Sequence, residues 1–241
     1  MRIGVLALQG NVREHVAALR RLGADVVEVR KPEQLEDLDG LVVPGGESTT
    51  FTRLMRLYGL DDAIRAFSGP IFGTCAGMIV LDRNHLDLVD LEVDRNAYGR
   101  QVASFEADLR LKGDDRLLHG VFIRAPRVRE AGESVEVLAD LDGEPVLLRE
   151  GRFLVASFHP ELTDDARVHE RFLELVREVV SPRLLGAPLA KEASERGAGQ
   201  YLNTAKRRER SILPPAVSGD GEGRLRRSRA VADREGEDVR A

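Results

Sequence analysis

The first third of the chain alternates short apolar runs with stretches whose apolar residues recur at helical spacing. Arg2 to Leu8 is rich in branched apolar residues, and from Val12 to Leu22 the apolar residues follow a helical period that Gly23 ends. The same reasoning predicts further strands and helices, in the order Ala24–Val29 (strand), Gly40–Val43 (strand), Thr50–Tyr58 (helix), Pro70–Phe72 (strand) and Ala76–Leu81 (helix). Such alternation is typical of a parallel sheet with helices on both faces.

From Leu91 onward, closely spaced strands replace this alternation. We predict them at Leu91–Val93, Ser104–Leu111, Gly120–Arg124, Ser134–Ala139, Pro145–Leu148 and Phe153–Phe158. Little helix separates these strands, so several should pair antiparallel. Thr163, Asp164 and Asp165 can then cap a last helix that runs to about Val180. The expected fold is therefore a three-layer α/β fold: a mostly parallel central sheet flanked by helices, with added antiparallel strands.

Charge divides the 241 residues into two regions of opposite sign. Residues 181–241 carry 13 Lys and Arg against 9 Asp and Glu, so the total of −5 leaves a net charge of −9 on residues 1–180. Beyond Ser181-Pro182 the sequence loses periodicity and has few large apolar residues to offset the entropy of ordering. We therefore expect one domain at 1–182 and a disordered, charged extension at 183–241. That extension could contact RNA or an acidic protein, but its composition favours a solvated tail without a partner.

Composition also limits the partners and the compartment. An acidic body lacks the basic face that phosphate binding needs, so no nucleic acid partner is expected. The longest apolar runs are far shorter than the roughly 20 residues of a membrane span. The amino-terminal segment lacks the cleavage pattern of a signal peptide, and a single cysteine fits a reducing compartment. The chain is expected to be cytoplasmic, without a membrane partner, a bound metal or a cofactor.

The loops after the predicted parallel strands should carry the function, because ligands bind at the carboxyl ends of such strands. One of them, Gly73-Thr74-Cys75-Ala76-Gly77, has the form G-x-C-x-G, a cysteine version of the nucleophile elbow between a strand and a helix. At a helix amino terminus the dipole favours a thiolate. On its own, however, a lone cysteine in such a turn is more often a small buried hydrophobic residue.

A base and an acid follow another predicted strand end, in Phe158-His159-Pro160-Glu161. A thiol nucleophile needs an imidazole to ionise it, and that imidazole needs a carboxylate to fix its tautomer. Cys75, His159 and Glu161 supply the three types together. A histidine before proline is by itself usually a turn residue, so the combination of the three features carries the hypothesis.

Gly45 and Gly46 follow the strand at Gly40–Val43 and could turn a backbone amide toward an oxyanion, with the amide of Ala76 as the second donor. An ordinary Gly-Gly turn would explain these glycines if they stood alone. Their position at a third strand end instead fits one site shared with the cysteine and the histidine.

These segments together resemble the class I, or triad, glutamine amidotransferases. The resemblance rests on Pro44-Gly45-Gly46-Glu47-Ser48-Thr49-Thr50, Gly73–Gly77 and Ser157–Thr163. More narrowly, the chain is similar to the glutaminase subunits of pyridoxal 5'-phosphate synthase over about residues 1–180. That similarity adds Ala7-Leu8-Gln9-Gly10-Asn11 with Glu14-His15, Arg95–Gln101 with Ser104-Phe105-Glu106, and Val121-Phe122-Ile123-Arg124-Ala125-Pro126.

The resemblance implies a flavodoxin-like fold and hydrolysis of L-glutamine to L-glutamate and ammonia through a glutamyl thioester. It implies that Cys75 is the nucleophile, that His159 is the acid and base, and that Glu161 orients the histidine. The amides of Gly46 and Ala76 would form the oxyanion hole. The glutamine would be held by Gly46, Glu47, Ser48, Arg95, Ile123 and Arg124.

The resemblance also implies a partner, a synthase subunit that accepts the ammonia in a hetero-oligomeric complex for vitamin B6 biosynthesis. Three alternatives remain at this point: a triad glutaminase with another ammonia acceptor, a different cysteine hydrolase or stress-response chaperone, and a non-catalytic module. Two features depart from the family pattern. The segment from Leu81 to Leu91 is shorter than usual, and the extension from about 183 has no counterpart.

Overall fold

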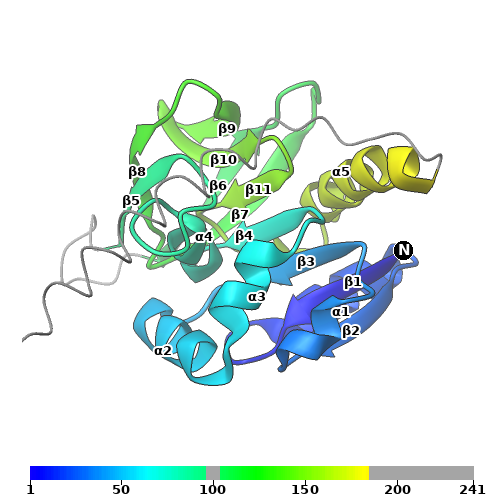
Figure 1. Ribbon diagram of the computed structural model, residues 1–241. Helices are drawn as coiled ribbons and strands as arrows, with labels where there is room; N and C mark the ends of the chain where they lie inside the picture. Colours follow the sequence, from blue (N-terminus) through cyan, green and yellow to red (C-terminus); the bar gives the residue numbers. More distant parts are fainter. Residues whose placement is uncertain (96–103, 185–241) are drawn as a thin grey trace, which may run out of the picture. The chain divides into compact units, whose positions relative to one another are not determined.

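Seven strands form the central sheet in the computed structural model, which describes residues 1–95 and 104–184 (Figure 1). The strand order is β2-β1-β3-β4-β11-β10-β9. The first five strands of this order run parallel, and the last two continue the sheet antiparallel. Their bounds are β1 Arg2–Leu6, β2 Asp25–Val29, β3 Gly40–Val43, β4 Ile71–Thr74, β9 Glu136–Leu141, β10 Glu144–Glu150 and β11 Phe153–Ala156.

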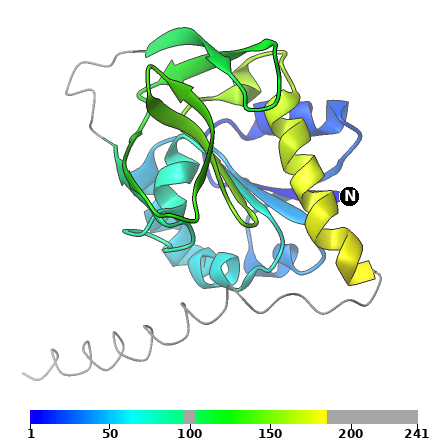
Figure 2. The same cartoon turned by 90° about the horizontal axis from the view of Figure 1, so that it is seen from above.

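Helices cover both faces of this sheet, which confirms the predicted three layers (Figures 1 and 2). Helices α1 (Val12–Arg21) and α5 (Arg167–Leu184) bury apolar residues such as Leu19 and Phe172 against one face. On the other face lie α2 (Ser48–Tyr58), α3 (Leu60–Ala66) and α4 (Ala76–Leu81), and their core includes Phe51 and Met78. The buried strands β3, β4 and β11 separate these two cores and end at the same edge of the sheet.

Two antiparallel pairs extend the fold beyond the central sheet, as the close strand spacing predicts. Strand β5 (Leu91–Asp94) pairs with β8 (Arg127–Ala131), and β6 (Ser104–Arg110) pairs with β7 (Leu117–Ile123). Two short 3₁₀ turns, η1 (Pro32–Leu35) and η2 (Pro160–Leu162), complete the elements of the described residues.

Most predicted elements are confirmed, and the differences are local. The sequence did not predict α3 or β8. Helix α5 begins at Arg167 and extends to Leu184, beyond the predicted end at about Val180. The predicted extension therefore shares its first two positions with α5, and residues 185–241 lie outside the described part of the chain.

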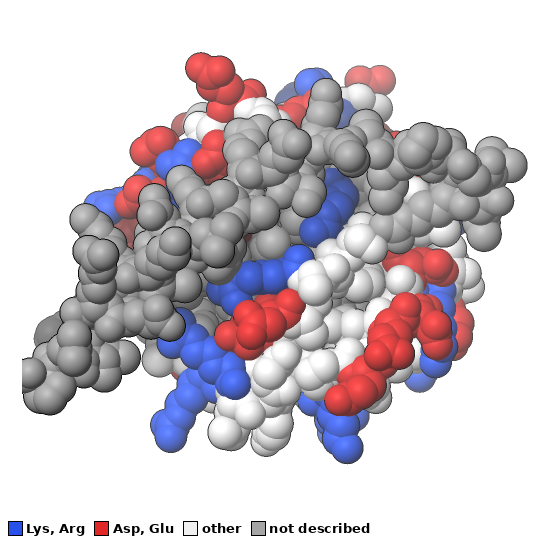
Figure 3. Space-filling model, viewed as in Figure 1, with Lys and Arg blue, Asp and Glu red and all other residues white. Residues whose placement is uncertain are grey.

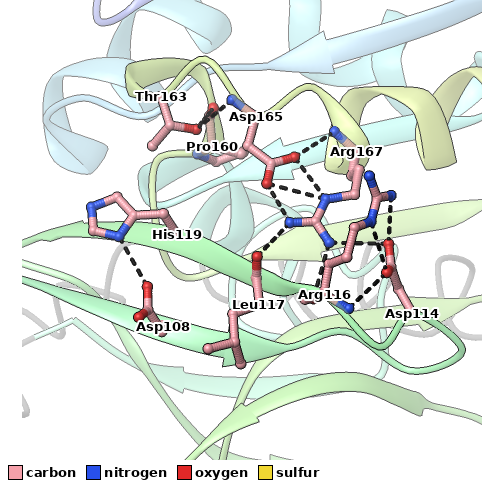
Figure 4. A network of polar contacts seen from close by, with 9 residues as sticks. All are labelled: Asp108, Asp114, Arg116, Leu117, His119, Pro160, Thr163, Asp165 and Arg167. Atoms are coloured by element: carbon pink, nitrogen blue, oxygen red, sulfur yellow. Dashed lines mark hydrogen bonds and ion pairs between the residues drawn. The ribbon is translucent and has the colours of Figure 1, made fainter.

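Arg167 fixes the start of α5 to the β6–β7 hairpin (Figure 4). Its guanidinium group donates to Asp114 Oδ2 at 3.0 Å, to the Leu117 carbonyl at 2.6 Å and to the Asp165 carboxylate. The Asp165 carboxylate also accepts from the backbone amide of Arg167 at 3.1 Å, while Thr163 Oγ1 accepts from the amide of Asp165. The predicted capping segment therefore lies directly before α5 and binds its first amide, and Arg167 joins the start of α5 to β7.

Charges of both signs are interspersed on the uncovered part of the face in Figure 3, so this part has no broad field of one sign. Many are paired, as Arg65 is with Asp62 at 3.3 Å. Within the described residues, no helix has the length and apolar character to cross a membrane.

Candidate active site

Strands β4 and β11 bring the predicted nucleophile and base together. They are parallel neighbours, and their last residues, Thr74 and Ala156, are paired in register. The amide of Cys75 donates to the carbonyl of Ala156 at 2.8 Å. The chain then continues from β11 through Ser157 and Phe158 to His159. The prediction that both residues follow strand ends at one edge of the sheet is confirmed.

Cys75 occupies the turn that the elbow motif predicts. Its φ of 48° is unusual for a residue with a side chain, and α4 begins at the next position. A Cβ atom at Gly77 would lie 2.0 Å from the carbonyl oxygen of Val43, so only glycine lets α4 pack this closely on β3. Cys75 is almost completely buried, and its Sγ lies 3.8 Å from the carbonyl oxygen of Ile123.

Glu161 contacts His159 through one ring nitrogen, Nδ1. Glu161 Oε1 lies 2.7 Å from His159 Nδ1, and both side chains are buried. Asn11 Nδ2 donates to the same carboxylate oxygen at 2.9 Å and lies 3.2 Å from His159 Nδ1. Asn11 thus contacts the predicted base and acid, whereas the sequence indicated it only as part of the family-like segment Ala7-Leu8-Gln9-Gly10-Asn11.

The electrostatics of the site favour an ion pair. Burial acts to lower the pKa of His159, but hydrogen bonds to Cys75 and Glu161 and their charges outweigh it and raise the pKa to about 10. Burial acts to raise the pKa of Glu161, but His15, His159 and Asn11 outweigh it and lower the pKa to about 2. An imidazolium beside the thiol stabilises a thiolate, which is the reactive form of cysteine.

Gly45 lies where the nucleophile and the base meet. A Cβ atom on Gly45 would lie 2.4 Å from His159 Cε1 and 3.2 Å from Cys75 Cβ. Its amide donates to Thr74 Oγ1 at 3.0 Å, which fixes the loop to the end of β4. Ala76, the other end of the predicted oxyanion hole, is the first residue of α4, where backbone amides lack intrahelical partners. The glycine pair and the elbow therefore face one site.

Gln9 holds the next part of this loop. Its Oε1 accepts from the amide of Glu47 at 3.1 Å, and its Nε2 donates to the carbonyl of Glu47 at 2.9 Å. The side chain of Glu47 caps α2 by accepting from the amides of Thr49 and Thr50, chiefly the latter, and these bonds lower its pKa to about 2. The sequence left open whether Glu47 contacts substrate or a neighbouring loop, and here its carboxylate binds the helix that follows.

The structure places the remaining predicted substrate residues at the start of α2, after β5 and at the end of β7. Ser48 is buried at the start of α2, and Arg95 donates to Thr49 Oγ1 at 3.1 Å. Ile123 ends β7 beside the Cys75 sulfur, and Arg124 follows with a φ of 46° and an exposed side chain. The family-like segment after Arg95 falls on residues 96–103, outside the described part. Among residues 1–95 and 104–184, no group of three or more His, Cys, Asp or Glu could hold a metal ion.

Comparison with known proteins gives a consistent result. Residues 5–179 match the model of the SNO glutamine amidotransferase family. The chain is 50% identical over 188 residues to "Pyridoxal 5'-phosphate synthase subunit PdxT" of Thermosipho africanus, a match that covers 74% of this chain and 100% of the relative. It is 54% identical to the protein of the same name from Geobacillus kaustophilus, covering 74% of this chain and 96% of the relative.

A solved structure agrees with these relatives. A crystal structure of a glutamine amidotransferase has 53% sequence identity to this chain and a TM-score of 0.68, and the match covers 72% of this chain and 98% of that one. Both the sequence match and the arrangement of strands and helices therefore extend over nearly the whole length of the compared proteins. The chain belongs to the SNO glutamine amidotransferase family.

Proposed function

We propose that this protein is the glutaminase subunit of a pyridoxal 5'-phosphate synthase, which hydrolyses L-glutamine to L-glutamate and ammonia for vitamin B6 biosynthesis. The names of its relatives and the family match support this assignment. The observation that carries the chemistry is the placement of Cys75, His159 and Glu161 at the ends of two paired strands, with Glu161 Oε1 2.7 Å from His159 Nδ1.

The first half of the reaction uses the ion pair. The Cys75 thiolate attacks the side-chain amide carbon of glutamine, and a carbon–sulfur bond forms as the carbonyl oxygen becomes negatively charged. His159 gives its proton to the amide nitrogen, so the carbon–nitrogen bond breaks and ammonia leaves. The product on the enzyme is a glutamyl thioester. The Glu161 carboxylate holds the imidazole ring and stabilises its charged form.

The second half restores the enzyme. Neutral His159 takes a proton from water, the resulting hydroxide attacks the thioester carbon, and the carbon–sulfur bond breaks to release glutamate. The amides of Gly46 and Ala76 hold the oxyanion in both halves. Gly46, Glu47, Ser48, Arg95, Ile123 and Arg124 hold the glutamine, with a cation such as Arg95 suited to the substrate α-carboxylate.

A partner is part of this proposal because free ammonia would be protonated and diluted in water. A synthase subunit accepts the ammonia in a hetero-oligomeric complex, and docking completes the oxyanion hole through the peptide of Gly45 and Gly46. The protein acts in the cytoplasm. The body, residues 1–182, performs the reaction, and the extension at 183–241 is not required. The family match, which ends at residue 179, supports this division.

A glutaminase assay with and without the synthase subunit tests the proposal. We expect slow ammonia release from glutamine by the free protein and faster release when the synthase is added. Cys75→Ala should remove the activity in both conditions, while His119→Ala, an exposed histidine on β7, should leave it unchanged. Ammonia release by Cys75→Ala would contradict the assigned nucleophile, and equal rates with and without the synthase would contradict the coupling.

Truncation tests the division of the chain. Removal of residues 185–241 leaves α5 complete and should leave the synthase-stimulated rate unchanged. A large loss of that rate, with an unchanged thermal unfolding midpoint, would show that the extension takes part in docking.

A further inference from the structure

Two further histidines lie directly behind the triad, and the mechanism above does not use them. His15 of α1 and His169 of α5 are completely buried, and His15 Nδ1 lies 3.0 Å from His169 Nε2. At its other end, His15 Nε2 lies 3.0 Å from Thr74 Oγ1 and 3.4 Å from Glu161 Oε2. His15 therefore connects the second oxygen of the triad carboxylate with the residue that precedes the nucleophile.

Burial favours the neutral form of His15. Its complete burial lowers its pKa, and this effect outweighs the raising effect of Glu161, while the charge of His159 acts to lower it further. Burial and the neighbouring His15 likewise lower the pKa of His169, to about 3. A neutral imidazole has one donor and one acceptor nitrogen, so the tautomer decides what His15 offers to each neighbour.

The His169 end of the network selects the tautomer. His169 Nδ1 is buried and has no hydrogen-bond partner among the described residues. A buried N–H without an acceptor costs more than a bare nitrogen, so the proton of His169 belongs on Nε2, where it is donated to His15 Nδ1. His15 then carries its own proton on Nε2.

The Glu161 end selects the same tautomer independently. Within residues 1–95 and 104–184, Glu161 Oε2 has no hydrogen-bond partner, and His15 Nε2 approaches it at 3.4 Å. In the other tautomer the Thr74 hydroxyl could donate to His15 Nε2, but the lone pair of that nitrogen would then face a carboxylate. With the proton on Nε2, the N–H dipole points toward the negative oxygen and toward Thr74.

We propose that His15 is a positioning residue of the glutaminase: a neutral imidazole whose Nε2–H group holds both the Glu161 carboxylate and the Thr74 hydroxyl, with its tautomer set by His169. The inference rests on the proposed function. Thr74 Oγ1 also accepts from the amide of Gly45 at 3.0 Å. The same N–H group therefore fixes the position of the Glu161 carboxylate and, through Thr74, the position of the Gly45 loop.

Nitrogen NMR of the full chain labelled with ¹⁵N-histidine tests the tautomer without any enzymatic assay. Long-range proton–nitrogen correlations distinguish a protonated ring nitrogen from a bare one, and correlation of each ring with its own backbone amide, in a sample that also carries ¹³C, assigns the signals. We expect a bare Nδ1 and a protonated Nε2 for His15, and the same for His169. A proton on His15 Nδ1 would overturn the proposal, whatever the fate of any variant.

Two substitutions then separate positioning from packing. The amide of His15→Gln can place a donor near the Nε2 position, whereas His15→Asn reaches only the Nδ1 position. Loss of the Nε2–H contact with the Glu161 carboxylate should lower kcat about ten-fold more in His15→Asn than in His15→Gln, with similar KM values. The same two changes at His85, which lies in the connection after α4 and contacts Asp82, provide the matched control and should leave kcat unchanged.

The outcomes distinguish this inference from the proposed function. If the unaltered chain hydrolyses glutamine with the synthase but the two His15 variants have equal kcat values, the positioning role is wrong and the glutaminase assignment stands. If the unaltered chain releases no ammonia, the proposed function fails, and the NMR result alone decides the tautomer. Should both variants fail to fold, as judged by circular dichroism, the NMR result again decides.

Discussion

Replacing Gly45 by alanine places one methyl group where the side chains of Cys75 and His159 meet. The new Cβ atom would lie 2.4 Å from His159 Cε1, 3.0 Å from His159 Nδ1 and 3.2 Å from Cys75 Cβ. The imidazole cannot easily yield, because it is buried and Glu161 and Asn11 both contact its Nδ1, at 2.7 Å and 3.2 Å. Either the ring or the glycine loop must therefore move, by about an ångström if the contact is to become an ordinary one.

This displacement sets the size of the effect. A misplacement of about 1 Å at a catalytic group can lower the rate by about 100-fold. Such a loss corresponds to about 2.7 kcal/mol of transition-state stabilisation. Overpacking of a buried site should also lower the free energy of unfolding, by about 1–3 kcal/mol. The expected result is therefore a large loss of kcat together with a moderate loss of stability.

Synthase-stimulated glutamine hydrolysis and urea denaturation measure the two effects. Gly4→Ala is the matched control, because its Cβ atom would also meet a neighbour at 2.4 Å, but that neighbour is the side chain of Leu38. This control should lose stability and keep kcat. If Gly45→Ala retained kcat within about two-fold of the unaltered chain, the close approach of His159 and the glycine loop would not be required for catalysis, and the reasoning would be refuted.

Three further predictions concern the stability of the fold. Glu47→Ala should lower the free energy of unfolding by about 1 kcal/mol because α2 loses its cap, and Glu47→Gln, which keeps an acceptor, should lower it less in the same urea titration. The contribution of Glu161 should be present above pH 4.5 and lost as the pH falls toward about 2, whereas that of His159 should be lost as the pH rises from 6.5 toward about 10. Glu161→Gln should flatten both limbs of the stability profile, and unchanged limbs would contradict the ion pair. Arg167→Ala should cost about 2 kcal/mol, since it removes the guanidinium that pairs with the Asp165 and Asp114 carboxylates, and a cost near zero would show that the link between α5 and β7 is unimportant.

The sequence predicted the parallel half of the fold well because each element has a clear local pattern. Strand β3 has the predicted bounds, and α1, β2 and α4 differ by no more than about one residue. Helix α3 was missed because it is short and follows α2 directly through Gly59, whose left-handed conformation ends one helix and precedes the next. Strand β8 lies at Arg127–Ala131, where a mostly polar and exposed sequence gives no apolar alternation.

The placement of Cys75 and His159 at one edge of the sheet was predictable because both residues follow strands with a strong apolar pattern, and parallel strands end at the same edge of a sheet. The supporting contacts were not predictable. Asn11 and His15 contact Glu161, and Thr74 contacts Gly45, each across a long stretch of chain, and such contacts depend on register and on side-chain direction. The role of Glu47 as the cap of α2 follows from two backbone amides near it, which the sequence alone could only suggest.

The origin of the nitrogen in the product tests the central claim most directly. The chain would be combined with the synthase subunit, its sugar phosphate substrates, glutamine labelled with ¹⁵N in the side-chain amide, and an equal concentration of unlabelled ammonium. Mass spectrometry of the pyridoxal 5'-phosphate would then measure the label. We expect predominantly labelled product with the unaltered chain and unlabelled product with Cys75→Ala. Unlabelled product with the unaltered chain would contradict the account.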